Sequence, residues 1–282
     1  MLIDYKHLYL PSDCENNCRN CGYGEELLEN KGVKKKISKV EDENIELLGK
    51  EPLKSKVFYE TLKELKKRGA RSIKIRTNAR LLSTKKKVKE VIKGGARVFE
   101  IEIFGPDSKT HNKVTDSKAG FSQMIEGVKH LNGGPNSFLS ARVGITRENQ
   151  GKLKEISDFV EKMGFHRIIF SLKDTDLHLD DLRKELRKCL DKNTANGIMS
   201  LTEGVPPCFL GDNYVYYIKE LYTDTIWSYT KLEECENCFY RDICPGVKDE
   251  FKKHNYGGKI SSLKENKDRK RTRKGVKKLR SR

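Results

Sequence analysis

The sequence lacks any long apolar stretch. No run in its 282 residues approaches the length of about 18 apolar residues that a membrane-spanning helix needs, so we expect no transmembrane helix and no membrane partner. The first residues, MLIDYK, read as a strand and do not have the layout of a signal peptide, which predicts a cytoplasmic location. The six histidines show no ligand spacing, so they do not predict a metal site.

Acidic residues are scarce at the C-terminal end. Residues 251–282 contain 14 Lys and Arg but only two acids, and therefore carry +12 of the formal net charge of +17. The remaining +5 is spread over residues 1–250, which are only mildly basic. The C-terminal segment also has almost no apolar residues, so it cannot bury enough surface to fold alone. It predicts either a disordered, solubilising tail or an arm that binds the phosphates of a nucleic acid.

Three of the eight cysteines lie together near the start of the chain. Cys14, Cys18 and Cys21 have the spacing C-x3-C-x2-C and follow directly after a predicted strand. Three thiolates are one fewer than a structural zinc ion or a fully ligated iron–sulfur cubane takes. A cubane held by three cysteines would leave one iron open for an exogenous ligand. The alternatives are a zinc knuckle completed by a distant Cys or His, and a chance cluster.

A second set of cysteines lies toward the C-terminal end. Cys235, Cys238 and Cys244 have the spacing C-x2-C-x5-C, and Cys208 precedes them. Four thiols are enough for a cubane or for a zinc ion. In a reducing compartment such cysteines are expected to be metal ligands rather than disulfides. Cys189 stands apart in a Lys/Arg/Leu-rich helix and is predicted to be an ordinary buried or half-buried thiol.

Strands and helices alternate over most of the chain, and their alternation predicts an α/β fold with a parallel sheet. Strands are predicted at 2–10, 45–48, 72–76, 97–104, 138–144 and 167–172. Helices are predicted at 54–68, 84–94, 121–131, 150–163 and 177–191. Six such units favour a partial (β/α)6, TIM-like barrel.

The alternation stops after Asn196-Gly197, and this change predicts the domain organisation. We expect a core domain over 1–196, a small irregular cysteine-bearing module over 197–250 and the basic tail over 251–282. The first cysteine set would then follow the first strand, at the edge of the sheet where α/β folds place their sites.

Residues 1–246 resemble the radical S-adenosylmethionine (radical SAM) superfamily, chiefly through Cys14-x3-Cys18-x2-Cys21 after the first strand. In that superfamily the three cysteines hold a 4Fe–4S cluster, and S-adenosylmethionine chelates its open iron. The resemblance implies reductive cleavage of S-adenosylmethionine to methionine and a 5′-deoxyadenosyl radical, which abstracts hydrogen from a substrate. It also implies a flavodoxin- or ferredoxin-type reductant.

Further segments resemble the elements of that superfamily that bind S-adenosylmethionine. Gly49-Lys50-Glu51-Pro52 is similar to its Gly-Gly-Glu-Pro, which contacts the methionine amino group, and Thr77-Asn78 is similar to its Thr-Asn-Gly turn. Arg142 lies where a contact to the methionine carboxylate is common. The resemblance thus implies a cofactor-binding set of Gly49, Glu51, Pro52, Thr77, Asn78, Glu102 and Arg142. The chain departs from the pattern at Lys50 and Ala79, which replace glycines, at Asn20, which replaces an aromatic residue, and at Glu102, where serine is frequent.

The second cysteine set resembles the auxiliary cluster modules called SPASM and twitch. Cys235-x2-Cys238-x5-Cys244 agrees with their spacing, with Cys208 as the implied first ligand, and Lys248 stands where the longer module has another cysteine. The resemblance implies a second 4Fe–4S cluster, fully ligated by protein. Because no iron would be open, we expect it to relay electrons.

Two substrates remain open for such an enzyme. One is a peptide or protein side chain, as in the maturases that share this C-terminal module, and the other is a nucleotide or tRNA, favoured by the basic tail. Molybdopterin-precursor synthases share the two-cluster plan, but their C-terminal double glycine is absent here. A hypothesis of another class is a nucleic-acid-binding protein with two zinc sites and no catalysis.

Overall fold

The computed structural model describes residues 5–19, 21–22, 33, 37–134, 137–175, 177–211, 214, 217–219, 228–251 and 263–264. The chain forms two compact units. The first, here called the core unit, comprises Tyr5–Gly144 and Glu155–Ile168. The second, here called the cysteine unit, comprises Met1–Asp4, Ile145–Lys154 and Ile169–Arg282. The domain bounds expected at 196 and 250 stay predictions.

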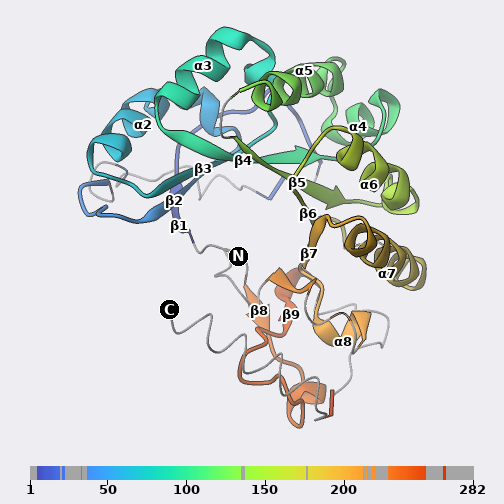
Figure 1. Cartoon of the computed structure of the whole chain (residues 1–282). Coiled ribbons are helices and arrows are strands. Elements are labelled where there is room, and N and C mark those ends of the chain that lie inside the picture. The colour runs from blue at the N-terminus through green and yellow to red at the C-terminus, as the bar shows by residue number, and fades with distance from the viewer. Residues whose placement is uncertain are drawn as a thin grey trace. The chain divides into compact units, whose positions relative to one another are not determined.

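Seven parallel strands form one open sheet in the order of the sequence (Figure 1). They are β1 (Lys6–Tyr9), β2 (Asn44–Leu48), β3 (Ser72–Thr77), β4 (Ala96–Ile103), β5 (Phe138–Ile145), β6 (Arg167–Leu172) and β7 (Met199–Glu203). Leu8 pairs with Leu47, Leu47 with Ile75, and Ile101 with Ala141, and the β3–β4 pair has a register shift between Ile73 and Lys74. The α/β fold with a partial, TIM-like sheet is confirmed, and β7 adds a strand to the six that the sequence predicts.

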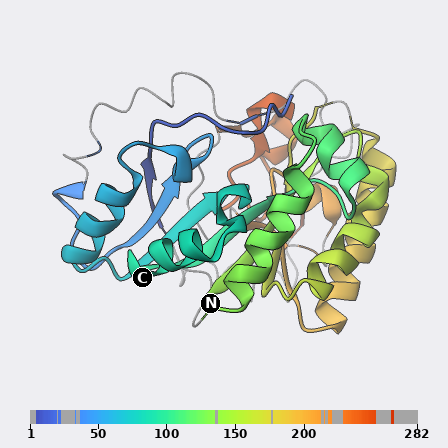
Figure 2. The ribbon, with the colours of Figure 1, turned by 90° about the horizontal axis from the view of Figure 1, so that it is seen from above.

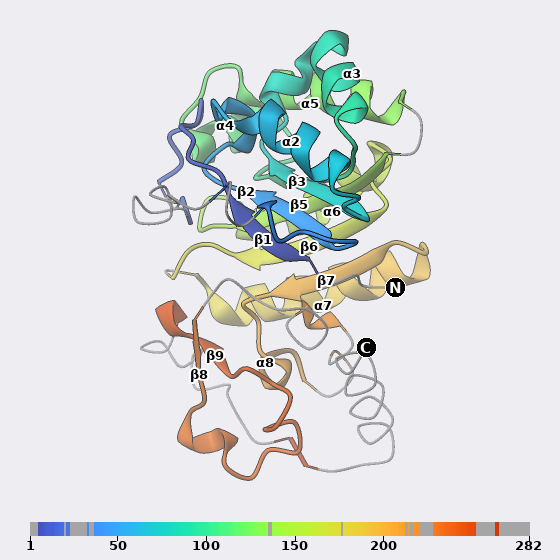
Figure 3. The same cartoon turned by 90° about the vertical axis from the view of Figure 1, so that its left-hand side faces the viewer.

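Helices lie on one face of the strands of the core unit. Figures 1 and 3 show α2, α3 and α5 on this face, and Figure 2 views the same layer from above. The helices are α2 (Phe58–Lys67), α3 (Lys85–Lys93), α4 (Ser108–Thr115), α5 (Gly120–Asn132), α6 (Leu153–Lys162), α7 (Leu179–Ala195) and α8 (Pro207–Leu210). Short 3-10 turns are η2 (Pro52–Lys54), η3 (Arg80–Ser83), η4 (Gln150–Lys152) and η7 (Glu233–Cys235). No helix among the described residues is both long and apolar enough to cross a membrane.

Apolar spacing explains why these segments are helical. In α2 the residues Phe58, Thr61, Leu62 and Leu65 are buried, while Glu and Lys occupy exposed or half-buried positions. Residues three and four apart share one face of a helix, so this face can pack on the sheet. The sheet offers an apolar face in return, because Ile73 and Ile75 of β3 alternate with Lys74 and Arg76 and are fully or almost fully buried.

The cysteine unit has a small second sheet. Here β8 (Tyr229–Thr230) pairs antiparallel with β9 (Val247–Lys248). Gly246 precedes β9 with a φ of 106°, and a Cβ on it would lie 2.3 Å from the carbonyl oxygen of Thr230. Only glycine fits at this position, which allows the chain to enter β9 immediately after Cys244.

Candidate functional site

The first cysteine set lies on the loop that leaves the C-terminal end of β1. The amide of Leu10 donates to the carbonyl of Leu48 at 2.8 Å, after which the loop begins. Cys14 and Cys18 are half-buried, and Cys21 is exposed. Parallel sheets place their sites at this edge, so the loop has the position that the sequence predicts.

The sulfur of Cys14 accepts two hydrogen bonds. The amide of Asn16 and the side-chain amide of Asn78 each donate to Sγ of Cys14 at 3.4 Å. Burial raises the pKa of the Cys14 thiol to about 11, and the carboxylates of Glu51 and Glu15 add to this rise, while the hydrogen bonds oppose it. If no cation binds its sulfur, Cys14 therefore stays a thiol at neutral pH. A cation bound to its sulfur would stabilise the thiolate form.

Glu51 is a fully buried carboxylate at the end of β2. Its Oε1 accepts from the amide of Leu53 at 3.2 Å and its Oε2 from the amide of Asn78 at 2.8 Å. The Thr77 hydroxyl lies 2.8 and 2.9 Å from the two oxygens. Burial raises the pKa of Glu51 to about 7 against these hydrogen bonds, and nearby Glu15 contributes to the rise.

Glu51 forms no ion pair with any described residue, and the donors described around it are all neutral. A buried carboxylate in this state gains most from a cation, because charge-assisted hydrogen bonds are about twice as strong as neutral ones. A primary ammonium group can donate charge-assisted hydrogen bonds to the Glu51 carboxylate.

Gly49 and Pro52 place Glu51. A Cβ on Gly49 would lie 2.6 Å from the carbonyl oxygen of Leu10 and 2.7 Å from Oγ of Ser12. Pro52 is buried and opens η2, with Glu51 as its N-cap. The amide of Glu51 donates to Oγ of Ser12 at 3.2 Å, which ties the end of β2 to the start of the cysteine loop.

The Thr77-Asn78 turn connects Glu51 to the cysteine loop. Asn78 donates from its main chain to Glu51, and from its side chain to Cys14 and, at 3.3 Å, to Oε2 of Glu15. Ala79 follows in a left-handed conformation with a φ of 60°. The alanine that replaces the expected glycine thus adopts the conformation that a glycine would take at lower cost.

Glu15 is a site residue that the sequence reasoning missed. Its Oε1 is buried and has no hydrogen-bond partner among the described residues. No spacing rule identifies this residue, because only the fold brings its side chain to Asn78. With Glu51 on the other side of Asn78, the site holds two carboxylates and fits a cationic ligand.

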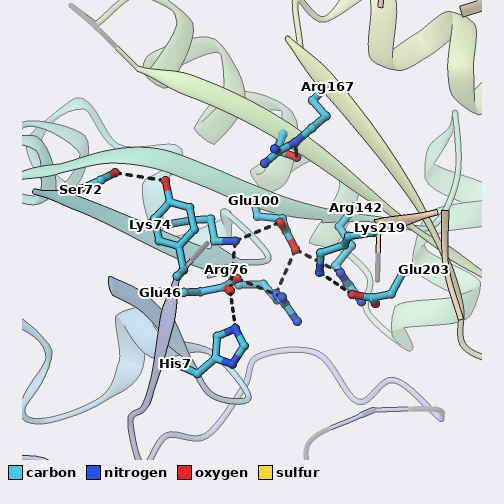
Figure 4. A network of polar contacts seen from close by, with 12 residues as sticks. His7, Glu46, Ser72, Lys74, Arg76, Glu100, Arg142, Arg167, Glu203 and Lys219 are labelled. Atoms are coloured by element: carbon cyan, nitrogen blue, oxygen red, sulfur yellow. Dashed lines mark hydrogen bonds and ion pairs between the residues drawn. The ribbon is translucent and has the colours of Figure 1, made fainter. Parts of the chain in front are cut away.

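Arg142 lies in a network of charged residues on the polar face of the sheet (Figure 4), and Glu102 contacts it. The Arg142 guanidinium is fully buried and contacts Glu100 at 3.2 Å and Glu102 at 3.3 Å. Two carboxylates of this chain thus already contact the guanidinium. Its contact to a cofactor carboxylate, and the cofactor contact of Glu102, stay predictions.

The rest of this network is also paired within the core unit. Glu46 contacts Lys74 and Arg76, each at 3.0 Å, and His7 at 3.3 Å. Burial alone would raise the pKa of Glu100, but Arg76 and Lys74 beside it hold that pKa well below its ordinary value. The described carboxylates and cations of this network thus contact one another rather than solvent.

The second cysteine set lines one cavity in the cysteine unit. Cys208 on α8, Cys235 at the end of η7, and Cys238 and Cys244 before β9 face an empty volume of about 420 Å³, its open mouth included. The structure therefore brings Cys208 to the other three. Burial raises the pKa of the Cys244 thiol to about 12, and repulsion from the three other cysteines adds to it. Four such thiols cannot all ionise without a compensating cation.

Both cysteine sets are chemically able to bind metal. All eight cysteines lie in the described ranges, and none forms a disulfide. Cys189 is buried, as predicted. Among the described residues, no three His, Cys, Asp or Glu side chains converge closely enough for one metal ion. The four thiols around one cavity suit a cubane or a zinc ion, and the three thiols of the first set suit a cubane with one open iron.

No protein-family model and no curated protein matches the sequence. Its fold does match solved structures of radical SAM enzymes. SuiB from Streptococcus suis, bound to its precursor peptide SuiA, is 18% identical with a TM-score of 0.56 over 69% of this chain and 47% of SuiB. anSMEcpe, with bound AdoMet and a Cp18Cys peptide, is 16% identical with a TM-score of 0.61 over 86% of this chain and 88% of that one.

HydG, a maturase of the [FeFe]-hydrogenase, matches at 14% identity with a TM-score of 0.50, over 72% of this chain and 52% of HydG. The chain therefore spans about half the length of SuiB and HydG, and most of anSMEcpe. At these identities the similarity establishes the fold, which is that of the radical SAM enzymes.

Proposed function

We propose that this protein is a radical SAM enzyme that binds a 4Fe–4S cluster through Cys14, Cys18 and Cys21 and acts on a peptide or protein. The observation that carries the proposal is the buried Glu51 carboxylate, which lacks a described cationic partner and is joined through Asn78 to Cys14. The chemistry that cluster and cofactor supply when bound is reductive cleavage of a sulfonium and abstraction of a hydrogen atom.

Glu51 would bind the α-ammonium group of S-adenosylmethionine. The amides of Leu53 and Asn78 and the Thr77 hydroxyl orient its oxygens before the ligand arrives. Binding the ammonium group would balance the buried charge, and exclusion of water would strengthen the contact. Glu15 offers its orphan Oε1 to a second donor of the same cofactor.

Asn78 would set the spacing between cofactor and cluster. One residue contacts the carboxylate for the ammonium group and the sulfur of a proposed iron ligand. Because S-adenosylmethionine must meet the open iron and Glu51 together, a fixed geometry between Cys14 and Glu51 lowers the entropy lost on binding.

The second cysteine set would hold an auxiliary 4Fe–4S cluster. Its support is the cavity that Cys208, Cys235, Cys238 and Cys244 share. A cluster ligated by four cysteines has no open iron, so its role would be electron relay from a flavodoxin- or ferredoxin-type reductant. Residues 1–196 would then form the catalytic domain and 197–250 the auxiliary module.

A peptide substrate is favoured because SuiB and anSMEcpe are solved with peptides bound, although the chain covers only 47% of SuiB. A tRNA substrate rests on the basic tail, residues 251–282, of which only 251 and 263–264 are described. Loss of tRNA retention on a filter after deletion of 251–282 would favour RNA.

Anaerobic reconstitution tests the proposal. The reconstituted protein should be brown, and after reduction with S-adenosylmethionine present it should release 5′-deoxyadenosine. The Cys18→Ala variant should release none. A colourless protein that retains zinc would favour the non-catalytic class, and a protein with filled clusters that forms no 5′-deoxyadenosine would refute the enzymatic proposal.

A further inference from the structure

The residues between Cys14 and Cys18 are each fixed to a neighbouring element. The guanidinium of Arg80 donates from Nη1 to the carbonyl of Glu15 at 2.8 Å and to Oδ1 of Asn16 at 2.7 Å. Asn17 donates from its amide to the carbonyl of Thr115 at 3.0 Å, at the end of α4. The loop is thus held at three successive residues.

Arg80 is itself fixed at both ends. Its amide donates to Oδ1 of Asn78 at 2.9 Å, in the turn that also contacts Cys14. Its Nε donates to Oε1 of Gln123 on α5 at 2.7 Å. The side chain is partly buried, so its orientation is determined by packing and by hydrogen bonds rather than by solvent.

The acceptors of Arg80 are all neutral. Those of its guanidinium are a backbone carbonyl and two side-chain amides, and Arg80 forms no ion pair with a described carboxylate. The positive charge of Arg80 acts on neighbouring groups. Burial lowers the pKa of His111 to about 4, and the charge of Arg80 contributes to this shift. A fixed cation without a described carboxylate partner therefore lies beside a loop with three thiols.

We propose that Arg80 is a positioning residue of the three-cysteine site, which holds the loop in place and raises the reduction potential of the bound cluster. The inference rests on the proposed function. A cation beside a thiolate-ligated cluster stabilises the reduced state, which carries one more negative charge. The same guanidinium that orders the loop thus makes reduction of the cluster easier.

The two roles separate in two variants. Arg80→Lys keeps the charge but cannot reproduce the planar fork, and Arg80→Met removes both. Arg71→Met is the matched control, because Arg71 pairs with exposed Asp42 at the surface of the same unit. Circular dichroism checks that each variant folds. If Arg80→Met does not fold, the two measurements below are made on Arg80→Lys alone.

The first measurement is hydrogen exchange of the metal-free protein. The amides of Asn16 and Asn17 should exchange at least about tenfold faster in Arg80→Met, because two hydrogen bonds from a charged donor are lost. Arg80→Lys should be intermediate, and Arg71→Met should exchange like the wild type. Unchanged exchange in Arg80→Met overturns the positioning role, whether or not the protein binds a cluster.

The second measurement is a redox titration of the reconstituted full-length protein, followed by the signal of the three-cysteine cluster. At a fixed solution potential, Arg80→Met should hold on the order of tenfold less reduced cluster, a shift of about 59 mV for one electron. Arg80→Lys should stay near the wild type. An unshifted Arg80→Met overturns the electrostatic role, and a wild type that takes up no cluster here refutes the proposed function as well.

Discussion

The side-chain amide of Asn78 donates a hydrogen bond to the sulfur of Cys14 at 3.4 Å. The two residues lie after different strands, β3 and β1. The main-chain amide of Asn78 also donates to Glu51 after β2, so one residue joins the ends of three adjacent strands. The proposed cluster ligand and the proposed ammonium ligand are therefore parts of one rigid arrangement.

Truncation of Asn78 should weaken cofactor binding. The Asn78→Ala variant keeps the main-chain contact to Glu51 but loses the hydrogen bonds to Cys14 and Glu15. A hydrogen bond to a charged group contributes about 1.5–3 kcal/mol, so the Kd for S-adenosylmethionine should rise at least about tenfold. Calorimetry of the reconstituted protein measures it. Asn132→Ala, which removes a contact to Met163, should bind like the wild type, and an unchanged Kd for Asn78→Ala would contradict the account.

Gly49 should tolerate no side chain. A Cβ at this position would lie 2.6 Å from the carbonyl oxygen of Leu10, and backbone cannot move aside as a side chain can. Gly49→Ala should therefore lower the free energy of unfolding by about 3 kcal/mol, measured by urea denaturation. Gly133→Ala is the control, because a Cβ there meets nothing closer than 3.5 Å. Equal stability of the two variants would show that Gly49 is not constrained.

Glu51 should make the stability of the cofactor-free protein fall with rising pH. Its pKa is raised in the folded state from 4.5 to about 7, so the folded protein favours the neutral form. The stability from this group is complete below the unfolded pKa of 4.5 and is lost as the pH rises through 7. Between about pH 5 and pH 8 the loss should reach about 2–3 kcal/mol.

Urea unfolding of the wild type and of Glu51→Gln across this pH range isolates the effect. The neighbouring ionisable groups Glu15 and Cys14 are present in both proteins, so the difference between them reports Glu51. That difference should change with pH by the amount given above. A constant difference would mean that Glu51 is already ionised at low pH and that its charge is balanced in another way.

The auxiliary site should account for half of the iron. Two cubanes correspond to about eight irons per chain, and Cys235→Ala should reduce this to about four. Cys189→Ala is the control, since Cys189 is buried in α7. Iron and acid-labile sulfide of the purified, reconstituted proteins measure the change. Wild-type iron content in Cys235→Ala would end the assignment of this cysteine set.

The sequence predicts the elements whose signals are local. The strand predicted at 72–76 and the helix predicted at 54–68 combine periodic apolar residues with clear ends, and β3 (Ser72–Thr77) and α2 (Phe58–Lys67) lie there. Strand β7 was missed because its sequence, Met199–Glu203, is short and holds only two apolar residues, although four of its five residues are buried. Helix α4 was missed because Ser108–Thr115 has no apolar stripe and is placed by its Asp107 cap.

The candidate site divides in the same way. The cysteines and Glu51 are found from spacing and from resemblance to known motifs. Glu15 and Arg80 could not be found, because their roles depend on contacts to Asn78 and Gln123 that lie far away in the sequence. Arg142 was expected from the resemblance to contact the cofactor. In the structure its guanidinium pairs with Glu100 and Glu102 of the chain itself.

The most direct test of the central claim is the electron paramagnetic resonance spectrum of the reduced Cys235→Ala protein, with and without S-adenosylmethionine. This variant should keep only the cluster at Cys14, Cys18 and Cys21, so its spectrum has a single source. If one iron is open to the cofactor, the account predicts that adding S-adenosylmethionine changes the spectrum. A filled cluster whose spectrum is the same with and without S-adenosylmethionine would contradict it.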